Sequence, residues 1–450
     1  MATYWVILII LAATILLLWL VFGINWRSKR NYYNSHHRMR ERLQAEYDEQ
    51  LMHLLYSGDD IEKVDEYYRP LCRIMTGDGR PNVTTSDEVE VITSGARKYE
   101  LIMRDIAEAK ESVHLEYFHF GIDKGSREVR SLLMQKAREG VKVRFINENI
   151  TNFPIPRIYY NRMRKAGVDV RHFTNNRFSI IRFLLTLSYR DHRKIMVIDG
   201  RIAYTGGMNI NDHYFKQWKD THLRLTGKSV AHLQFTFLET WIRIGGRLPE
   251  PLRAYMPVLD EHNNLPEGSL LTQITPDDPT SPEAVLQTAY EWILNHAQRY
   301  VWLQSPYLAP PDSLVEAVRN AVKRGVDVRI MVPEHCDTVL MKPINRSFYN
   351  DFIQTGAQLY LRSGEFNHSK TIVTDNYLSM VGTTNLDNRS FGIDYEIDTF
   401  FYNKQMALQC KATFESELPN CRLLTKQELD KQSWIDKKFC NIMRVLAPIV

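Results

Sequence analysis

Short runs of β-branched and aromatic residues alternate along the chain with longer runs whose apolar positions have helical spacing. Residues 112–120 (SVHLEYFHF) and 141–146 (VKVRFI) are typical of strands, and the run at 126–140 between them is typical of an amphipathic helix. The same order of strand, helix and strand returns at residues 300–308 (YVWLQSPYL), 313–325 and 326–332 (VDVRIMV).

This repeated rhythm predicts an α/β fold built from two similar α/β/α lobes, each with a largely parallel or mixed sheet. The repeat is much longer than the roughly 20–50 residues of a solenoid unit, so it indicates a duplicated domain. We expect four segments: an anchor at 1–26, a helical linker at 27–85, a first lobe at 86–260 and a second lobe at 261–450.

The chain begins with a long apolar run. Residues 4–24 are uncharged and mostly apolar, which is long enough to cross a hydrocarbon core of roughly 30 Å as a transmembrane helix. No basic residue precedes the run, whereas Arg27, Lys29 and Arg30 follow it. The positive-inside rule then places the remaining chain in the cytoplasm, behind a single-pass anchor in the cytoplasmic (inner) membrane. A cleaved signal peptide is the alternative, but the run is too long for one.

Three further segments leave two interpretations open. Residues 34–55 are charged with a helical pattern, and they either lie along the anionic leaflet or form a solvated linker helix. Residues 177–190 and 434–450 mix basic and bulky apolar side chains. Each of these two segments either dips into the membrane interface or packs into the protein core.

Two stretches of the chain, at 189–212 and 366–389, are nearly the same. Each contains the pattern H-x-K-x-x-x-x-D, starting at His192 and at His368. One such pattern is a weak motif, but matching residues continue well beyond it in both copies. At equal offsets from the two histidines lie Lys194 and Lys370, Asp199 and Asp375, Gly206 and Gly382, Asn209 and Asn385, and Asp220 and Glu396.

These residues suit chemistry at a phosphodiester. The period of a strand places the histidine and lysine of each copy on one face, and a glycine turn returns an asparagine. Lysine and asparagine can neutralise the phosphate oxygens without a metal, so no cofactor is expected. One neutral histidine can attack phosphorus and the other can act as acid and base, and the residues alone do not decide which. Asp220 and Glu396 would each accept the Nδ1 proton of one imidazole.

The remaining candidates have both a structural and a functional interpretation. Asp199 and Asp375 either take part in catalysis or only hold strand and turn together. Glu116 and Gln304 occupy equivalent positions on the first strand of each half, where they either line the substrate cleft or pack inside the lobe.

Bulk composition narrows the classes of partner. The 450 residues carry a net charge of +4, which is too mild to indicate nucleic acid as a ligand. The five cysteines, Cys72, Cys336, Cys410, Cys421 and Cys440, are scattered, so neither a disulfide framework nor a zinc cluster is expected. The sequence contains no signal for an oligomeric state.

The paired motifs resemble the HKD signature of the phospholipase D superfamily, and over roughly residues 90–450 the chain is similar to bacterial cardiolipin synthases. The resemblance also rests on 218–227 (WKDTHLRLTG), 304–314 (QSPYLAPPDSL) and 382–398 (GTTNLDNRSFGIDYEID). It implies two lobes related by pseudo-twofold symmetry around one site. It further implies that two phosphatidylglycerol molecules give cardiolipin and glycerol at a membrane. By the same resemblance, His192 would be the nucleophile and His368 the acid and base, while Lys194, Lys370, Asn209 and Asn385 would hold the phosphate.

Two departures from the family and several rival functions accompany this resemblance. The family usually begins with two hydrophobic segments and this chain with one. Residues 147–152 (NENITN) replace an expected Asp-containing turn, with Glu148 a candidate substitute. The rivals are a phospholipase D-type hydrolase, a phosphatidyltransferase with another donor or acceptor, a membrane-bound nuclease and a non-enzymatic scaffold. The anchor and the modest charge argue against the nuclease.

Overall fold

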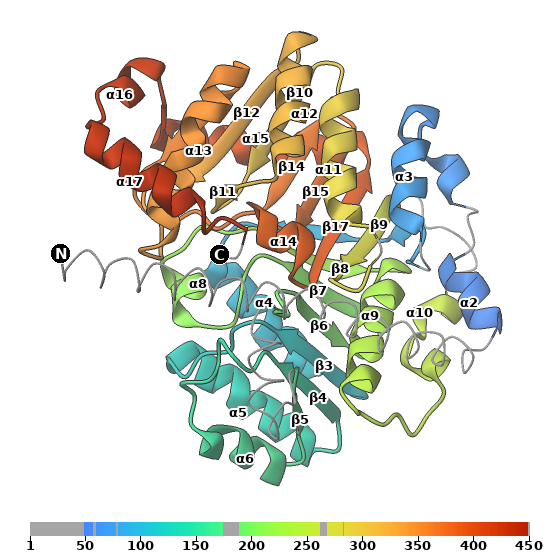
Figure 1. The fold of residues 1–450 in the computed structure, drawn as a ribbon. Coiled ribbons are helices and arrows are strands. Elements are labelled where there is room, and N and C mark those ends of the chain that lie inside the picture. The colour runs from blue at the N-terminus through green and yellow to red at the C-terminus, as the bar shows by residue number, and fades with distance from the viewer. Residues whose placement is uncertain are drawn as a thin grey trace.

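The computed structural model describes residues 49–56, 60–77, 80–173, 189–261, 268–281 and 283–448. They form two α/β lobes stacked on each other, the second lobe above the first in Figure 1. The predicted anchor at 4–24, and nearly all of the apolar stretch at 177–190, lie outside the described residues. Among the helices within those ranges, none combines the length and the apolarity needed to span a bilayer.

The first lobe is built on a seven-stranded mixed sheet. Its strands lie in the order β2-β8-β7-β6-β3-β4-β5, with β3, β4 and β5 parallel and the other pairs antiparallel. The strands are β2 (Val89–Ile92), β3 (Ser112–Tyr117), β4 (Lys142–Asn147), β5 (Asp169–His172), β6 (Lys194–Ile198), β7 (Ile202–Gly206) and β8 (His222–Thr226). The helices are α4 (Gly95–Glu108), α5 (Lys124–Arg138), α6 (Arg157–Lys165), α8 (Asp212–Lys216), α9 (Ser229–Arg243) and α10 (Val258–Glu261), with a 3-10 turn at Leu252–Tyr255.

The second lobe is built on a nine-stranded sheet in the order β1-β9-β17-β15-β14-β10-β12-β13-β18. Its strands are β1 (Thr84–Ser86), β9 (Leu270–Asp277), β10 (Tyr300–Gln304), β12 (Asp327–Pro333), β13 (Gln358–Arg362), β14 (Thr371–Thr374), β15 (Leu378–Gly382), β17 (Glu396–Tyr402) and β18 (Cys421–Leu423). A separate parallel pair joins β11 (Leu308–Ala309) to β16 (Leu386–Asp387). The helices are α11 (Val285–His296), α12 (Asp312–Lys323), α13 (Met341–Thr355), α14 (Asn388–Gly392), α15 (Lys404–Glu417), α16 (Lys426–Asp430) and α17 (Trp434–Arg444), with a 3-10 turn at Leu418–Asn420.

The two sheets have the same topology. When the edge strands β1 and β18 are set aside, the order β9-β17-β15-β14-β10-β12-β13 repeats β2-β8-β7-β6-β3-β4-β5 strand for strand. The predicted strands at 112–120, 141–146, 300–308 and 326–332 correspond to β3, β4, β10 and β12. The duplication that the sequence indicates is therefore present in the fold.

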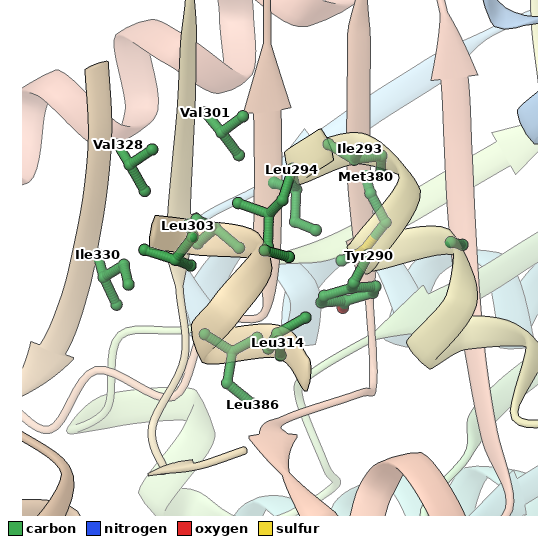
Figure 2. Packing of buried hydrophobic residues seen from close by; sticks show 14 of the residues in the cluster. Tyr290, Ile293, Leu294, Val301, Leu303, Leu314, Val328, Ile330, Met380 and Leu386 are labelled. Carbon is green, nitrogen blue, oxygen red and sulfur yellow. The ribbon is translucent and has the colours of Figure 1, made fainter. Parts of the chain in front are cut away.

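Local sequence explains why these elements form. Helix α5 begins where the side chain of Asp123 accepts a hydrogen bond from Ser126 N, and α15 begins at an equivalent cap by Asn403. Strand β3 is buried along its whole length: Val113, Leu115 and Tyr117 alternate along it and enter the core of the first lobe. In Figure 2, Tyr290, Ile293 and Leu294 of α11 pack against strand residues of the second sheet. Apolar burial of this kind is the main stabilising contribution to each lobe.

A further hydrophobic cluster joins the two lobes. Helix α9 is buried along nearly its whole length, and it shares this cluster with α15 and with inward-facing residues of both sheets. Trp241 is the largest of the fully buried side chains. Because one continuous core spans both lobes, we expect them to be held in a fixed relative orientation.

The expected linker at 27–85 is only partly a linker. Within it, α2 (Glu49–Tyr56) buries Leu51 and Leu55 in the cluster shared by the lobes. Short 3-10 turns at Ile61–Lys63 and Glu66–Tyr68 lead into α3 (Arg69–Thr76), which packs on α11. Figure 1 shows α3 in blue beside the yellow α11. The described residues 61–86 thus extend the second lobe, because their apolar side chains complete its core.

Candidate active site

The two motif histidines sit where the lobes meet, and backbone hydrogen bonds fix them there. His192 lies two residues before the start of β6, and its backbone N–H donates to the carbonyl of Tyr395 in the second lobe at 2.9 Å. His368 precedes β14, and its N–H donates to the carbonyl of Lys219 in the first lobe at 2.7 Å. His192 therefore lies beside Tyr395, the residue before Glu396. His368 lies beside Lys219, the residue before Asp220.

The side chains follow the same crossed arrangement. Glu396 of the second lobe holds His192, with both carboxylate oxygens 3.0 Å from Nδ1. Asp220 of the first lobe holds His368, with Oδ2 2.8 Å from Nδ1. The equal sequence offsets predict two carboxylate–imidazole pairs but not the crossing, which depends on how the lobes dock. Because each pair takes one member from each lobe, neither lobe alone contains a complete pair.

A glycine turn makes room for one of these carboxylates. A Cβ atom on Gly207 would lie only 2.0 Å from Oδ1 of Asp220, so a larger residue would displace that carboxylate. The preceding Gly206 has φ +125°, a backbone conformation that favours glycine. The two glycines at the end of β7 therefore leave space for the carboxylate that holds His368.

The motif lysines lie buried against the histidines. Lys194 Nζ donates to the carbonyl of His192 at 2.5 Å, and Lys370 Nζ donates to the carbonyl of His368 at 2.5 Å. Lys370 Nζ is also 2.7 Å from His368 Nδ1. That nitrogen carries one proton at most in the neutral ring, so donation to Asp220 leaves the carbonyl as the acceptor for Lys370. The two ammonium groups supply positive charge next to both imidazoles.

Both histidines line one cavity of about 640 Å³ between the lobes. The paired asparagines also reach it: Asn209 Oδ1 accepts from His119 N, while Asn385 Oδ1 has no hydrogen-bond partner among the described residues. The cavity is lined by Phe118, His119, Thr151, His192, Asn209, Asn211, His213, Tyr214, Trp218, Tyr307, Asp337, Thr338, Leu340, Met341, His368, Asn385, Asp387, Arg389 and Asp394.

The surroundings of the two histidines differ although their backbones are equivalent. The ring of His368 is packed by Tyr214, Trp218 and Phe366, with ring centroids 5.4, 5.7 and 5.9 Å away. His192 packs against Phe118 at 4.9 Å, and the charges of Arg389 and Asp394 act on it. The site is therefore symmetric in its reacting groups and asymmetric in its walls.

Sequence reasoning missed these wall residues. Trp218 and Asp394 lie at the same offset of 26 from their histidines, and His213 and Arg389 share an offset of 21. The equal offsets are the signal that would have found them. It is a weak signal, because the residue types differ between the two copies.

Burial sets the protonation of the site. It lowers the pKa of both imidazoles well below the usual range, and the neighbouring lysines add to that effect. It also lowers the pKa of Lys194 to about 8 and that of Lys370 to about 7, and raises that of Glu396 to about 8. A neutral imidazole, which a nucleophile requires, is thus the favoured resting form.

The aspartates of the two motifs do not belong to the cavity, so their predicted catalytic role is corrected. The Asp199 carboxylate accepts from the backbone N–H groups of residues 110–112, at 2.7 to 2.9 Å. Asp375 accepts from those of residues 298–300 in the same way. Both have positive φ, 51° and 53°, which aspartate tolerates. Each aspartate closes the turn after its histidine strand onto the start of the neighbouring strand.

Asp199→Ala is accordingly expected to lower the free energy of unfolding by about 1–3 kcal/mol, since it leaves three N–H groups without their carboxylate. Because this carboxylate is partly exposed, the loss stays well below that of a fully buried ion. Urea unfolding measures the change. Asp199→Asn, which keeps an acceptor and tolerates the positive φ, should lose less. An unchanged urea midpoint in Asp199→Ala would contradict the assignment.

Two other predicted site residues also lie elsewhere. Glu116 is fully buried and pairs with Arg193 at 2.6 Å, and Gln304 is buried on the equivalent strand β10. Neither is among the residues that line the cavity, so the predicted contact with substrate is not supported. The physical reason is that Arg193, which alternates with His192 and Lys194, points away from the site and draws Glu116 to it.

Glu148 anchors the turn where the sequence departs from the family pattern. Its carboxylate accepts from Arg190 at 2.9 and 3.1 Å and from Thr151 N at 2.6 Å. It therefore ties this turn to the segment that leads into His192. In the part of the chain that the structure describes, no three His, Cys, Asp or Glu side chains are grouped so as to hold a metal ion.

Comparison with known proteins gives one family. A family model described as "Cardiolipin synthase, PLD-like domain" matches residues 102–241 and 291–418, one segment in each lobe. The chain is 31% identical to the major cardiolipin synthase of Bacillus subtilis, over 96% of this chain and 90% of that protein. It is 32% identical to a cardiolipin synthase of Listeria monocytogenes, over 88% of this chain and 81% of that protein.

Solved structures share the fold. The crystal structure of phosphatidylserine synthase from Haemophilus influenzae matches with a TM-score of 0.62 at 14% identity, over 86% of this chain and all of that chain. A polyphosphate kinase from Porphyromonas gingivalis matches with a TM-score of 0.51 at 13% identity, over 76% of this chain and 49% of that chain. These likenesses identify the architecture of the two lobes and carry no information on substrate.

Proposed function

The chain belongs to the family of cardiolipin synthases with phospholipase D-like domains, and from this premise we propose that it transfers a phosphatidyl group between two phosphatidylglycerol molecules. The products are cardiolipin and glycerol. The observation that carries the proposal is the crossed pair of carboxylate-held histidines in one cavity, because this arrangement supplies a nucleophile and an acid at a single phosphorus centre.

The first step forms a covalent intermediate on His192. Glu396 engages Nδ1 of this ring, which leaves Nε2 as the attacking nitrogen. The Nε2–phosphorus bond forms while the bond from phosphorus to the glycerol headgroup oxygen breaks. His368 is neutral in the empty site, and it takes up a proton when the phosphodiester anion binds, because the anion and Asp220 together stabilise the imidazolium. It then donates this proton to that oxygen, and glycerol leaves. Glu396 stabilises the positive charge that develops on the His192 ring.

The second step reverses these roles. The terminal hydroxyl of another phosphatidylglycerol gives its proton to the now neutral His368 and attacks phosphorus. The new oxygen–phosphorus bond forms as the nitrogen–phosphorus bond breaks, so His192 returns to its resting state. Asp220 keeps His368 oriented for both proton transfers, since it holds Nδ1 throughout.

The lysines and asparagines stabilise the charge on the phosphoryl oxygens. Asn209 and Asn385 reach the cavity directly, and Asn385 Oδ1 has no partner among the described residues. Lys194 and Lys370 are fully buried against the histidines, so they act chiefly through their charge at short range. In this proposal the asparagines contact the phosphate and the lysines act on it through their charge.

The membrane placement is also part of the proposal. The lipid substrate requires access to a bilayer, and the apolar run at 4–24 with its following basic residues supports a single-pass anchor in the cytoplasmic membrane. On this basis the two lobes face the cytoplasm.

Product analysis tests the reaction. Purified full-length protein would be mixed with phosphatidylglycerol vesicles, and lipids and glycerol measured by mass spectrometry. The proposal predicts one cardiolipin and one glycerol for every two phosphatidylglycerols consumed. A hydrolase with the same residues would instead give phosphatidic acid as the main product, and that result would overturn the transferase assignment. Formation of product only after another lipid is added would indicate a different donor or acceptor.

The pH dependence follows from the buried lysines. The pKa of Lys194 is lowered to about 8 and that of Lys370 to about 7, so both ammonium groups lose their charge as the pH rises through this range. We expect kcat/KM to fall as the pH rises from about 7 through about 8, since the phosphodiester anion is then progressively less neutralised. Lys194→Arg, whose side chain stays charged, should weaken this alkaline decline even if its rate is lower. A kcat/KM that still rises at pH 9 would contradict the assignment.

A further inference from the structure

Helix α17, close to the end of the chain, has an apolar face that the described protein leaves uncovered. Ile435, Phe439 and Ile442 follow each other at helical spacing, and Trp434 and Val445 extend the same face. Each of these five side chains is between 53% and 73% exposed. Large apolar side chains gathered in this way on a folded surface usually mark a site of association.

The opposite side of α17 is firmly attached to the second lobe. Cys440 is buried, and Met443 packs against the second-lobe core. Arg444 forms an ion pair with Asp351 of α13 at 2.5 Å and lies over the ring of Phe348 at 4.0 Å. The exposed face is therefore held in place by the lobe, and it does not result from a loosely attached helix.

The helix also leads toward the cavity. It packs on α13, whose first residue, Met341, lines the cavity. The residues just before α13 are also apolar and exposed: Val339 is 90% exposed, and Leu340, which lines the cavity as well, is 50% exposed. Figure 1 shows α17 in red lying against α13 on the second lobe. An exposed apolar surface is thus connected through α13 to the wall of the active site.

Exposed lysines accompany this surface. Lys437 and Lys438 are exposed on α17 itself, and Lys431 is exposed just before it. An exposed apolar face bordered by lysines is the composition of a helix that lies in the interface of an anionic bilayer, with its apolar side chains among the acyl chains and its ammonium groups at the lipid phosphates.

We propose that α17, together with Val339 and Leu340, docks on the surface of an anionic lipid bilayer and holds the mouth of the cavity against it. The occupant is the membrane itself, and the inference rests on the proposed lipid substrate. The two interpretations of residues 434–450 are then compatible: Cys440 and Met443 pack into the core, and the opposite side of the helix faces outward. Docking at this point would let a phospholipid headgroup enter the cavity while its acyl chains remain in the bilayer.

The first test separates docking from chemistry. The triple variant Ile435→Gln, Phe439→Gln, Ile442→Gln changes only exposed side chains, so the fold should persist. Activity would be measured on phosphatidylglycerol vesicles and on a short-chain phosphatidylglycerol below its micellar concentration. We expect a loss of about tenfold or more on vesicles and an unchanged rate on the soluble substrate. The control variant Ile158→Gln, Leu408→Gln alters exposed apolar residues of α6 and α15 and should change neither rate.

The second test observes contact with lipid directly. Full-length protein in phosphatidylglycerol proteoliposomes would carry a photoreactive benzoylphenylalanine in place of Phe439, and in a control in place of Asp436, which is exposed away from the apolar face. Lipid adducts with Phe439→benzoylphenylalanine and few with the control would support docking. Crosslinks to a second protein chain would overturn the proposed docking in favour of a dimer interface. Equal losses of activity of the triple variant on both substrates would also overturn it. Absence of product from wild-type protein on either substrate would overturn the proposed function, whereas the lipid crosslinks test docking alone.

Discussion

His192→Asn is expected to lower the rate of phosphatidyl transfer by at least about 10⁴-fold, because it removes the nitrogen that forms the covalent bond to phosphorus. His368→Asn is expected to lower the same rate by about 10²–10⁴-fold, since it removes general acid and base catalysis but leaves the nucleophile. Initial rates of cardiolipin formation would measure both losses. Circular dichroism would show that each variant remains folded.

A substrate with an activated leaving group separates the two histidines. A phosphatidyl ester of p-nitrophenol needs little proton donation, so His368→Asn should still release one equivalent of p-nitrophenol in a burst and then stall at the covalent intermediate. His192→Asn should give no burst. The reverse pattern, with a burst in His192→Asn and none in His368→Asn, would show that the roles of the two histidines have been exchanged.

Glu396→Gln and Asp220→Asn are expected to have the second-largest effects, of about 10²–10⁴-fold on transfer, because each leaves one imidazole without the carboxylate that orients it and stabilises its cation. The crossed arrangement makes a sharper prediction. Glu396→Gln should behave like His192→Asn and weaken the burst, although Glu396 belongs to the second lobe. Asp220→Asn should behave like His368→Asn and retain the burst.

The two substitutions are matched controls for each other. Both replace a buried carboxylate by an amide of the same size, and both residues hold the Nδ1 atom of one histidine across the lobe boundary. General damage to the fold would lower the burst and the steady-state rate together in both variants. If Glu396→Gln instead behaved like His368→Asn, and Asp220→Asn like His192→Asn, the crossed arrangement would be wrong.

Much of the fold could be predicted from the sequence, because it depends on local patterns. Alternating apolar runs with the glycine-marked helix ends identify β3, β4, β10 and β12 and the helices between them. The equal offsets in the two motif copies show that His192 and His368 belong to one duplicated design. Such patterns are set by neighbouring residues and are visible in a single sequence.

Contacts between distant segments could not be predicted in this way. The crossing of Glu396 to His192 depends on the docking of the lobes, which no local pattern encodes. The placement of residues 61–86 on the second lobe depends on which core they complete. Asp199 illustrates a different difficulty: a motif aspartate that binds three backbone N–H groups and one that touches substrate have the same sequence signature.

Detection of the phosphatidyl group on the protein tests the central claim most directly. Full-length wild-type protein would be mixed with phosphatidylglycerol and quenched within milliseconds at alkaline pH, because a phosphohistidine is labile in acid. Mass spectrometry of the resulting peptides would locate the adduct. We predict a phosphatidyl adduct on the peptide that contains His192, formed before cardiolipin accumulates. An adduct on His368, or cardiolipin formation with no adduct at any time, would contradict this account.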